Sequence, residues 1–573
     1  MWKRAWYLTS LLLVAALVGS ACGGAATTPP APTTAPPAET QPPPPTEPPP
    51  ATQEPAILRI GWSGAPDSLN PAAGLLTESY TLYELTYDTL IGLDLSGTYY
   101  PELAESWEVS DDGTVWTFHL REGVKFHDGT DFTAEDMAFS IQFYKDHEEF
   151  PYLNSYTLNF ETVEATDDAT LVITLGEPIG NMESQVLFLY ALPKHIWEGI
   201  GFDEALTFEN LEMIGTGPFK VVKYVRDQSI ELAANKDHYR NPPKIDGVIF
   251  QTYESSDALV QALREGQADL ITDVPPTTIA SLKQEANITA QVGGSRSLRD
   301  IILNVVPDDK CPAEGGVCSG HPALKDRVVR QALAHATDKQ QIIDVALLGL
   351  GTPGLSMVPR SLGDWFNSEL EDYAYDVDLA NKMLDDAGYK DTDGDGVREM
   401  PDGTNPLKFR FLIPSDILTG AREGDLIKAM WNEAGVDIDI QVLEPDTVTA
   451  ACCPAFDYDV LLWGWSADPD PAYLLGVLTT DEIDTGFSET GYSNPVYDQL
   501  YLDQSTAVDH EARKKIIWEM QKIALEDVPY IIPYYQNNVM AYRNDKFTGY
   551  VYVEGGLLSL DDPLSLSNVE PVR

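Results

Sequence analysis

The stretch that decides the fold is PELAESWEVSDDGTVWTFHLREGVKFHDGTDFTAED, residues 101–136. Within it, residues 115–120 alternate in the way that predicts a strand with one buried face, preceded by a hairpin at 111–113. Thr133 then has the character of a helix N-cap, with Asp136 three residues later at the reciprocal position of a capping box. A strand and a helix in close succession indicate a mixed α/β protein.

The rest of the chain extends this mixture without a fixed repeat period. Residues 57–62 read as a strand, and helical periodicity covers 329–336 and a segment from about 378 to the glycine at 388. Asp338 is placed to cap a further helix. A chain of 573 residues exceeds what one hydrophobic core usually organises, so we expect more than one lobe.

Short motifs follow one another in order from residue 56 almost to the C-terminus. They are Leu58-Arg-Ile-Gly-Trp62, Ser68-Leu-Asn-Pro71, Tyr87-Asp-Thr-Leu-Ile-Gly92, the 101–136 stretch, Gly215-Thr-Gly-Pro-Phe219, Asn235 to Tyr239, Arg330 to Ala336 with Asp338, and Ala380 to Tyr389. This ordered set resembles the family 5 extracellular solute-binding proteins of ABC importers, the oligopeptide, dipeptide and nickel-binding group.

The resemblance implies a mixed α/β fold of the type II periplasmic-binding-protein kind, with two lobes, an extra inserted domain and a hinge between the lobes. The expected parts are 56–92 plus 212–275 plus 529–573 for lobe one (domain I), 93–211 for the inserted domain II, and 276–528 for lobe two (domain III). Crossings near Pro275 and Val528 would act as hinges whose closure traps the ligand.

The N-terminus reads as a secretion signal over residues 1–21, because two basic residues precede a short apolar run at 6–18 that is too brief to span a bilayer. The small residues before Cys22 resemble a bacterial lipobox, which implies lipidation of Cys22, although Gly19 stands where such sites usually have leucine. An ordinary signal peptide that contains a cysteine is the alternative. In the lipoprotein interpretation the protein is anchored at the outer face of the cell membrane, in an extracytoplasmic or periplasmic location.

Residues 22–55 are rich in proline, which favours an extended, semi-rigid tether between a lipid and a folded body. The formal net charge of the chain is -53. Such a polyanion repels phosphate backbones, so we expect no nucleic-acid partner.

Four cysteines remain for an oxidising compartment. Cys311 and Cys318 flank a short loop and are expected to close it as a disulfide. Cys452 and Cys453 leave three alternatives open: a vicinal bridge, a bond to another loop, or two free thiols.

The candidate ligand site is the segment Trp463-Gly-Trp-Ser-Ala-Asp-Pro-Asp-Pro471, in which indoles and carboxylates could stack on a ligand and pair with a cation. The resemblance implies that Asp468 holds the α-ammonium of a peptide and that Trp465 forms a pocket wall, with Trp463 beside it. The alternative is an Asx turn followed by a helix, with both tryptophans in the core.

The resemblance also implies ligand contacts on two other segments. These are the loop containing Leu75, Leu76 and Thr77, and the pair Tyr534 and Tyr535 beside the second crossing. Packing alone is the alternative for each of them.

An acidic loop has the ligand spacing, though not the helix pair, of an EF-hand, and predicts a structural calcium ion. Its candidate ligands are Asp391, Asp393, Asp395, Val397, Glu399 and Asp402. A solvated acidic turn without metal is the alternative.

Enzyme motifs fail on inspection. A glycine pattern at 349–354 follows a helix and contains a proline, and the segment 61–65 misses the last glycine of a nucleophile elbow. Together with the resemblance, this leads us to expect a monomeric, non-enzymatic protein without a required cofactor. The resemblance implies that it captures a short peptide and delivers it to an ABC permease. An oligosaccharide or a nickel complex is the alternative ligand. A secreted hydrolase, and a chemosensory or adhesive lipoprotein, are the remote alternatives.

Overall fold

The computed structural model describes residues 54–150 and 153–573. The signal segment, Cys22 and nearly all of the tether lie outside these residues. Within them, the largest sheet has eleven strands in the order β15-β14-β16-β12-β17-β11-β1-β10-β9-β8, and β13 pairs with β17. The strands are β1 (Ile57–Trp62), β8 (Phe219–Val225), β9 (Ser229–Ala234), β10 (Gly247–Thr252), β11 (Leu270–Ile271), β12 (Ile288–Leu303), β13 (Gly351–Pro353), β14 (Lys408–Pro414), β15 (Asp437–Leu443), β16 (Val460–Ser466) and β17 (Tyr530–Arg543).

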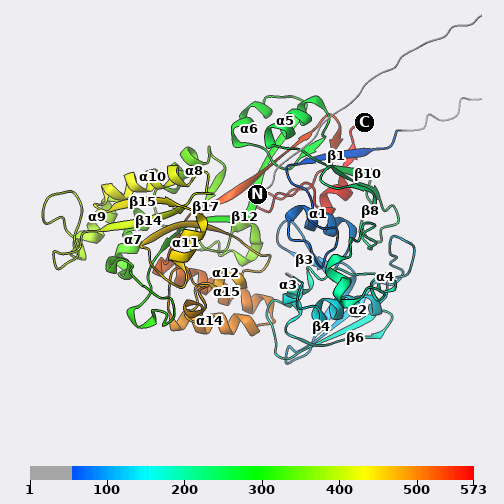
Figure 1. The fold of residues 1–573 in the computed structure, drawn as a ribbon, viewed down its shortest axis with the longest axis horizontal. Helices are drawn as coiled ribbons and strands as arrows, with labels where there is room; N and C mark the ends of the chain where they lie inside the picture. The colour runs from blue at the N-terminus through cyan, green and yellow to red at the C-terminus, as the bar shows by residue number, and fades with distance from the viewer. Residues whose placement is uncertain (1–53, 151–152) are drawn as a thin grey trace, which may run out of the picture. The chain divides into compact units, whose positions relative to one another are not determined.

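Two long antiparallel strands, β12 and β17, lie next to each other in the middle of this sheet (Figure 1). At one end Ile288 pairs with Arg543, and at the other Ile302 pairs with Tyr530. The register shifts between Gly294 and Leu298, so the ladder is interrupted midway along β12. These strands connect the two halves of the sheet.

The helices pack around the sheets (Figure 1). They are α1 (Thr77–Thr86), α2 (Ala134–Asp146), α3 (Met182–Val186), α4 (Lys194–Trp197), α5 (Ser256–Glu265), α6 (Pro276–Leu282), α7 (Arg327–His335), α8 (Lys339–Ala346), α9 (Val377–Asp386), α10 (Gly420–Glu433), α11 (Pro445–Cys452), α12 (Ala472–Gly476), α13 (Glu482–Thr485), α14 (Pro495–Thr506), α15 (His510–Asp527) and α16 (Pro563–Asn568). None of the helices in the described ranges combines the length and apolar character of a membrane span.

Two large hydrophobic cores correspond to the two lobes. One gathers buried residues of β1, α1, β10 and α2, and the other gathers residues of β14, β16, α7, α10 and α15. A third, small core lies under α5 and α6. This arrangement confirms the predicted mixed α/β architecture with two lobes.

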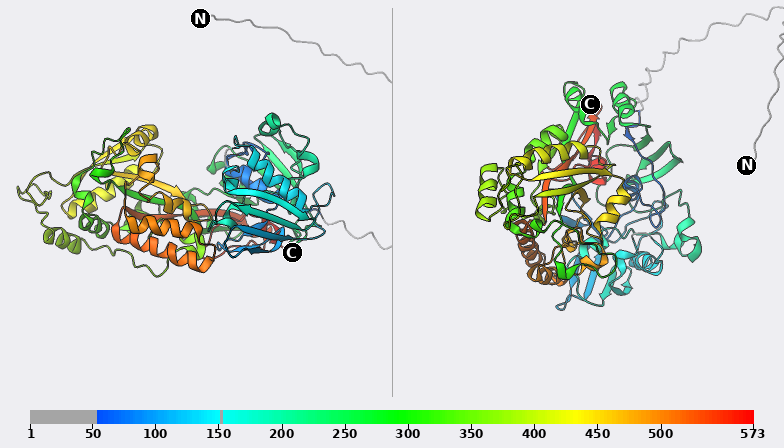
Figure 2. Two further views of the ribbon diagram at one scale, coloured as in Figure 1. Left: turned by 90° about the horizontal axis from the view of Figure 1, so that it is seen from below. Right: turned by 60° about the vertical axis from the view of Figure 1, so that its left-hand side comes forward.

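The stretch 101–136 folds as its pattern predicts. Val115–Leu120 is β5, the second strand of the sheet β4-β5-β7-β6, and its Trp116, Phe118 and Leu120 are buried. The remaining short strands are β2 (Ile91–Leu93), β3 (Tyr99–Pro101), β4 (Ala104–Val109), β6 (Phe160–Asp167), β7 (Thr170–Leu175), β18 (Phe547–Thr548) and β19 (Glu570–Pro571). The Thr133 and Asp136 side chains form the capping box of α2, which packs on β6 and β7 (Figure 2).

The crossings between the lobes lie inside β12 and β17. Pro275 is the N-cap of α6, whose Ile279 shares the small core with Ile288 of β12. Val528 and Ile531 both belong to the core of the second lobe. Core membership therefore favours hinges near the register shift of β12 and the facing part of β17, rather than at Pro275 and Val528.

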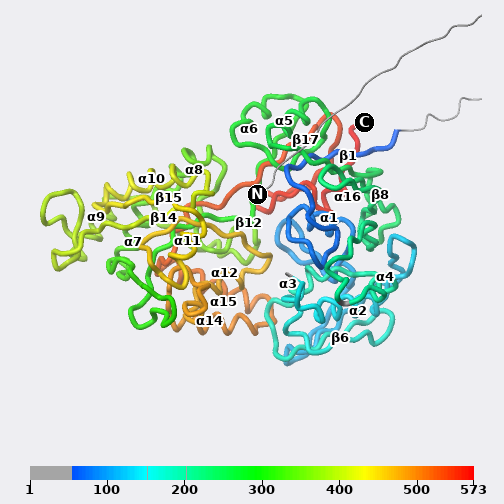
Figure 3. Tube along the Cα trace, in the orientation of Figure 1, coloured from blue at the N-terminus to red at the C-terminus, as the bar shows by residue number. Residues whose placement is uncertain are grey.

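The C-terminal segment after β17 returns to the first lobe (Figure 3). Leu557 forms a bridge with Gly294 of β12, and Leu558, Leu560 and Leu566 are buried in the first-lobe core. This return brings residues 557–564 beside α1 and β2, where they line a cavity.

Candidate functional site

The candidate site follows β12 at the crossing, where residues of both lobes meet. Ser297, Leu298 and Arg299 line a groove of about 300 Å³ together with Trp463 and Trp465 of β16. The antiparallel register explains the grouping, because Leu298 pairs with Trp465 and Asp300 with Trp463, so these side chains share a face. The structure thus places both predicted tryptophans at a groove.

Trp465 is held by a buried acidic residue that the sequence did not single out. The indole Nε1 of Trp465 donates to Glu489 Oε2 at 3.0 Å, and the Tyr530 hydroxyl donates to the same oxygen at 2.9 Å. Burial raises the pKa of Glu489 to about 7, against the lowering effect of these two hydrogen bonds. The indole also packs edge-on against Tyr473 and Phe487, so its orientation is fixed.

Asp468 lies on the loop that follows β16. Its side chain remains open to solvent, and no hydrogen bond or ion pair to another described residue engages its carboxylate. Partial desolvation raises the pKa of Asp468, Arg296 opposes that rise, and Asp470 adds to it. Asp470, in contrast, forms a buried bidentate pair with Arg513. Of these two neighbouring carboxylates, only Asp468 is available to a ligand.

Arg296 of β12 faces carboxylates from both lobes. Its Nε is buried and has no hydrogen-bond partner in the described part of the chain. Burial lowers the pKa of its guanidinium, while Glu84 of α1 and Asp468 raise it. Arg296 is therefore the cation between an acid of the first lobe and an acid of the second.

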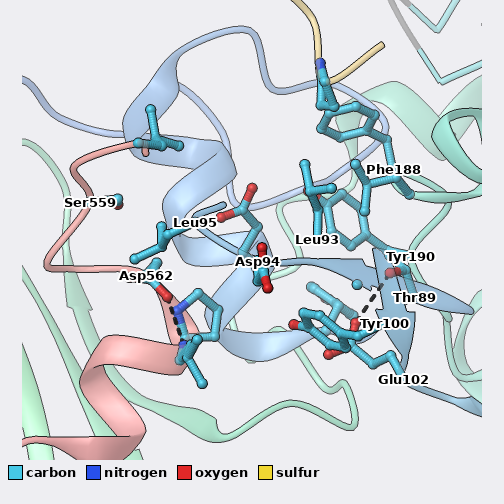
Figure 4. A pocket seen from close by; sticks show the side chains of 18 of the residues that line it. Thr89, Leu93, Asp94, Leu95, Tyr100, Glu102, Phe188, Tyr190, Ser559 and Asp562 are labelled. Carbon is cyan, nitrogen blue, oxygen red and sulfur yellow. Dashed lines mark hydrogen bonds between the residues drawn. The ribbon is translucent and has the colours of Figure 1, made fainter. Parts of the chain in front are cut away.

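A cavity of about 160 Å³ adjoins Arg296 on the first-lobe side (Figure 4). The acidic residues that line it are Glu84, Asp94, Glu102 and Asp562. Burial raises the pKa of Glu84 and of Glu102 to about 7 and that of Asp562 to about 8. The cavity is thus rich in carboxyl groups, of which Glu102 is buried, Asp94 and Asp562 are half-buried, and Glu84 keeps part of its side chain open to solvent.

The predicted loop before α1 is exposed and does not line either cavity. Leu75 and Leu76 are 51% and 48% exposed, and their amides donate to the carboxylate of Asp67 at 2.9 and 3.1 Å. Thr77 begins α1. Residues seven apart lie on one helix face, so Thr77 and Glu84 share the side of α1 that reaches the cavity.

Tyr534 and Tyr535 lie inside the second-lobe core. The Tyr534 hydroxyl accepts from Arg299 Nε at 3.0 Å and donates to Glu423 Oε1 at 3.0 Å. The Tyr535 hydroxyl donates to Ser356 O at 2.8 Å. Both side chains are at most 3% exposed and neither lines the cavities described above, so the structure shows packing rather than a pocket wall at these positions.

The acidic loop brings four of its predicted ligands together. One carboxylate oxygen each from Asp391, Asp393, Asp395 and Glu399 lies within 4.8 Å of the others. Asp402 does not belong to this group, because its carboxylate turns to Thr404 as an Asx turn. The amide of Val397 donates to Asp395 at 2.8 Å. Four carboxylates at this spacing could hold a hard divalent cation.

Both cysteine pairs are joined in the structure, Cys311 to Cys318 and Cys452 to Cys453. The second pair takes the vicinal alternative of the three that the sequence left open. It ends α11 in the second lobe, and neither cysteine lines the groove or the cavity.

The sequence did not indicate Arg296, Glu84, Glu489 or Asp562 as site residues. Each is an isolated charged residue in a segment without a recognisable motif, and their sequence separation reaches 478 positions, from 84 to 562. The only local signal is the Gly293-Gly294 pair just before Arg296, because glycine within a strand often marks a close approach of chains.

Two lobes joined by crossing strands, with an open carboxylate and a cation where they meet, define a binding protein that acts by capture. The comparisons agree. Residues 98–485 match the family described as bacterial extracellular solute-binding proteins, family 5 Middle. The chain belongs to this family, whose members bind solutes without a catalytic role.

The similar proteins differ in what their names say they bind. The oligopeptide-binding protein AppA of Bacillus subtilis is 27% identical, with 96% of each chain covered. Heme-binding protein A of Haemophilus influenzae is also 27% identical, over 82% of this chain and 85% of its own. The structure of HbpA2 from Haemophilus parasuis matches with a TM-score of 0.75 and 24% identity, over 90% of this chain and all of that one. The chain is therefore an ABC-importer solute-binding protein of the group to which these peptide- and heme-binding relatives belong.

Proposed function

We propose that this protein captures a short peptide between its lobes and delivers it to an ABC permease. Asp468 accepts the ligand's α-ammonium, and the groove along Trp463 and Trp465 receives the adjoining peptide unit. The observation that carries the proposal is the open carboxylate of Asp468, which stands at the crossing without a partner of its own among the described residues. A partly desolvated carboxylate gains from a charge-assisted hydrogen bond more than a fully hydrated one does.

The fixed orientation of Trp465 favours a peptide over a sugar. A sugar platform needs an open indole face, whereas this ring is flanked by Tyr473 and Phe487 and tied to Glu489. Trp465 is therefore a rigid side wall of the groove, and its indole Nε1 is already hydrogen-bonded within the protein. Such a wall suits a groove that binds a peptide chain.

Capture proceeds by closure of the lobes about β12 and β17. Ligand contacts with both lobes stabilise the closed state relative to the open one, and the difference in affinity sets the shift in population. The closed form then docks on the permease, and the lipid on Cys22 with the tether to residue 55 keeps the protein at the membrane.

The test is thermal unfolding of the folded body from residue 56 against di- to pentapeptides, oligosaccharides, nickel and heme. At a hundredfold excess over the dissociation constant, a ligand stabilises the folded state by about 2.7 kcal/mol. We expect peptides to raise the melting temperature and Asp468→Asn to remove most of that rise.

The matched control is Asp378→Asn, which makes the same charge change on the exposed first turn of α9. It should keep the full peptide response. A response confined to sugars, nickel or heme, or a peptide response that Asp468→Asn leaves intact, would contradict the ammonium contact.

A further inference from the structure

The carboxyl-rich cavity beside Arg296 is too small for a whole ligand. Its volume of about 160 Å³ compares with roughly 300–1,000 Å³ for pockets that enclose complete small molecules. It opens next to Pro469, the residue that follows Asp468. A peptide held at Asp468 therefore has one side chain within reach of this cavity.

The cavity holds hydrogen-bond acceptors that the protein does not use. Asp562 caps α16 through Oδ1, which accepts from the amides of Leu564 and Ser565, and its buried Oδ2 has no partner in residues 54–150 and 153–573. Glu84 likewise makes no hydrogen bond or ion pair within these ranges, although part of its side chain is open to solvent.

Tyr190 is an independent indication that this cavity binds a polar group. Its side chain is only 2% exposed, it lines the cavity, and its hydroxyl has no hydrogen-bond partner in the described part of the chain (Figure 4). A buried hydroxyl without a partner costs about 1–3 kcal/mol, so native structures rarely leave one without a reason.

The charges around the cavity identify what would complete it. Glu102 is already paired with Arg240 at 2.8 Å. One carboxylate oxygen of Asp94 accepts hydrogen bonds from the amides of Ser96 and Thr98. Arg296 acts electrostatically on Glu84 but not on Asp562, and within residues 54–150 and 153–573 it is not within salt-bridge distance of either carboxylate. A second cation is therefore favoured between them.

We propose that this cavity is a subsite for a positively charged side chain of the ligand, so that the protein selects peptides containing lysine or arginine. The ammonium or guanidinium donates to Glu84 and to Asp562 Oδ2, and the Tyr190 hydroxyl contributes a further polar contact. The proposal rests on the proposed function, since it places a side chain of the peptide whose amino terminus Asp468 holds.

The experiment is isothermal titration of the folded body with tripeptides. Lysine is placed at each position of trialanine in turn, and norleucine at the same position supplies an uncharged chain of similar length. We expect lysine to bind at least about tenfold more tightly than norleucine at one position, the size of one charged hydrogen bond. Glu84→Gln should abolish this preference, Tyr190→Phe should reduce it, and Asp378→Asn should leave it unchanged.

The number of protons released when the peptide binds provides a second readout. Burial raises the pKa of Glu84 to about 7 and of Asp562 to about 8, so a bound cation favours their ionised forms and releases protons near neutral pH. The measured enthalpy for the lysine peptide should then depend on the buffer's ionisation enthalpy more strongly than that for the norleucine peptide.

The outcomes separate this subsite from peptide capture itself. If all tripeptides bind with no lysine preference, or if Glu84→Gln retains the preference, the subsite is refuted and peptide capture stands. If no tripeptide binds, peptide capture fails, and agmatine, a small guanidinium without a carboxylate, then decides the subsite. Agmatine binding that Glu84→Gln removes supports a cation site, and absence of agmatine binding overturns it.

Discussion

The orientation of Trp465 depends on its hydrogen bond to the buried acid Glu489, and a second buried acid, Asp300, lies close to Glu489. The Asp300 side chain is 0% exposed, both of its carboxylate oxygens lack a hydrogen-bond partner among the described residues, and its pKa is raised by burial and by Glu489. Two buried carboxyls of this kind favour protonated forms. We therefore expect the groove wall to respond to pH.

We predict that Glu489→Gln makes the protein more stable at pH 8. The pKa of Glu489 is about 7 in the folded state against an ordinary value of 4.5, so its contribution to stability is fully present below pH 4.5 and is lost as the pH rises through 7. Glutamine stays neutral, still accepts from Trp465, and can donate towards Asp300.

Thermal unfolding between pH 5 and pH 8 measures the effect. The wild type should lose stability across this interval more steeply than the variant. Parallel curves would show that Glu489 does not titrate in this range.

Among single residues, the sequence indicates site residues that belong to a recognisable motif. It does not indicate residues that reach the site only through tertiary packing. Trp463 and Trp465 were predicted from one short segment, and they line a groove. Glu84 carries no local signal and Arg296 carries only the glycine pair before it, because nothing in their own segments shows that β12 passes beside the cavity that α1 lines. Tyr534 and Tyr535 were assigned to the pocket by resemblance, but their hydroxyls bond inside the core.

Among the elements, the loop 391–399 has a geometry that suits a structural metal ion, and we propose calcium as its occupant. Asp391 accepts from the amides of Gly394 and Gly396 at 2.6 and 3.0 Å, and Gly396 has φ +93°, which glycine adopts without strain. Four converging carboxylates repel one another until a cation neutralises them.

Calcium at millimolar concentration should raise the melting temperature relative to the same protein in chelator, by up to about 2.7 kcal/mol of stability at a hundredfold excess over the dissociation constant. Asp393→Asn should remove most of this increase. Asp402→Asn is the matched control, because Asp402 lies in the same loop but outside the carboxylate group, and it should respond as the wild type does. An equal calcium response in both variants would contradict the site.

Elements set by local chemistry could be predicted from the sequence, and those set by distant partners could not. Strand β1 spans Ile57–Trp62 as predicted, Asp338 caps α8 by accepting from the Gln341 amide, and Gly388 follows α9 with φ +91°. By contrast, the polar and glycine-containing first half of β12 becomes a strand because it pairs with β17, some 240 residues later. The sequence placed hinges at Pro275 and Val528 because it could not reveal this pairing.

For the molecule as a whole, function requires that the two lobes move about a compliant segment. The ladder between β12 and β17 is continuous from residue 288 to 294, resumes at Leu298 and shifts again between Arg299 and Ile301. Residues 295–297 therefore have no regular β17 partners, although Ser297 pairs with Ser466 of β16. The neighbouring glycines also have little room, since a Cβ on Gly293 would meet Leu558 at 2.7 Å. Flexibility here comes from missing ladder bonds rather than from empty space.

We therefore predict that amides of residues 295–297 exchange with solvent faster than those of 288–292 and 299–303 in the ligand-free protein. Amides that lack a ladder bond open with less free energy than amides within a continuous sheet. A saturating peptide should slow exchange across this segment, because closure of the lobes buries it against the ligand. Hydrogen exchange with mass spectrometry on short overlapping peptides measures both effects. Uniform protection along β12, with fast exchange near Pro275 and Val528 instead, would return the hinges to the positions that the sequence alone suggested, and the crossing strands would then move with one lobe as a rigid unit.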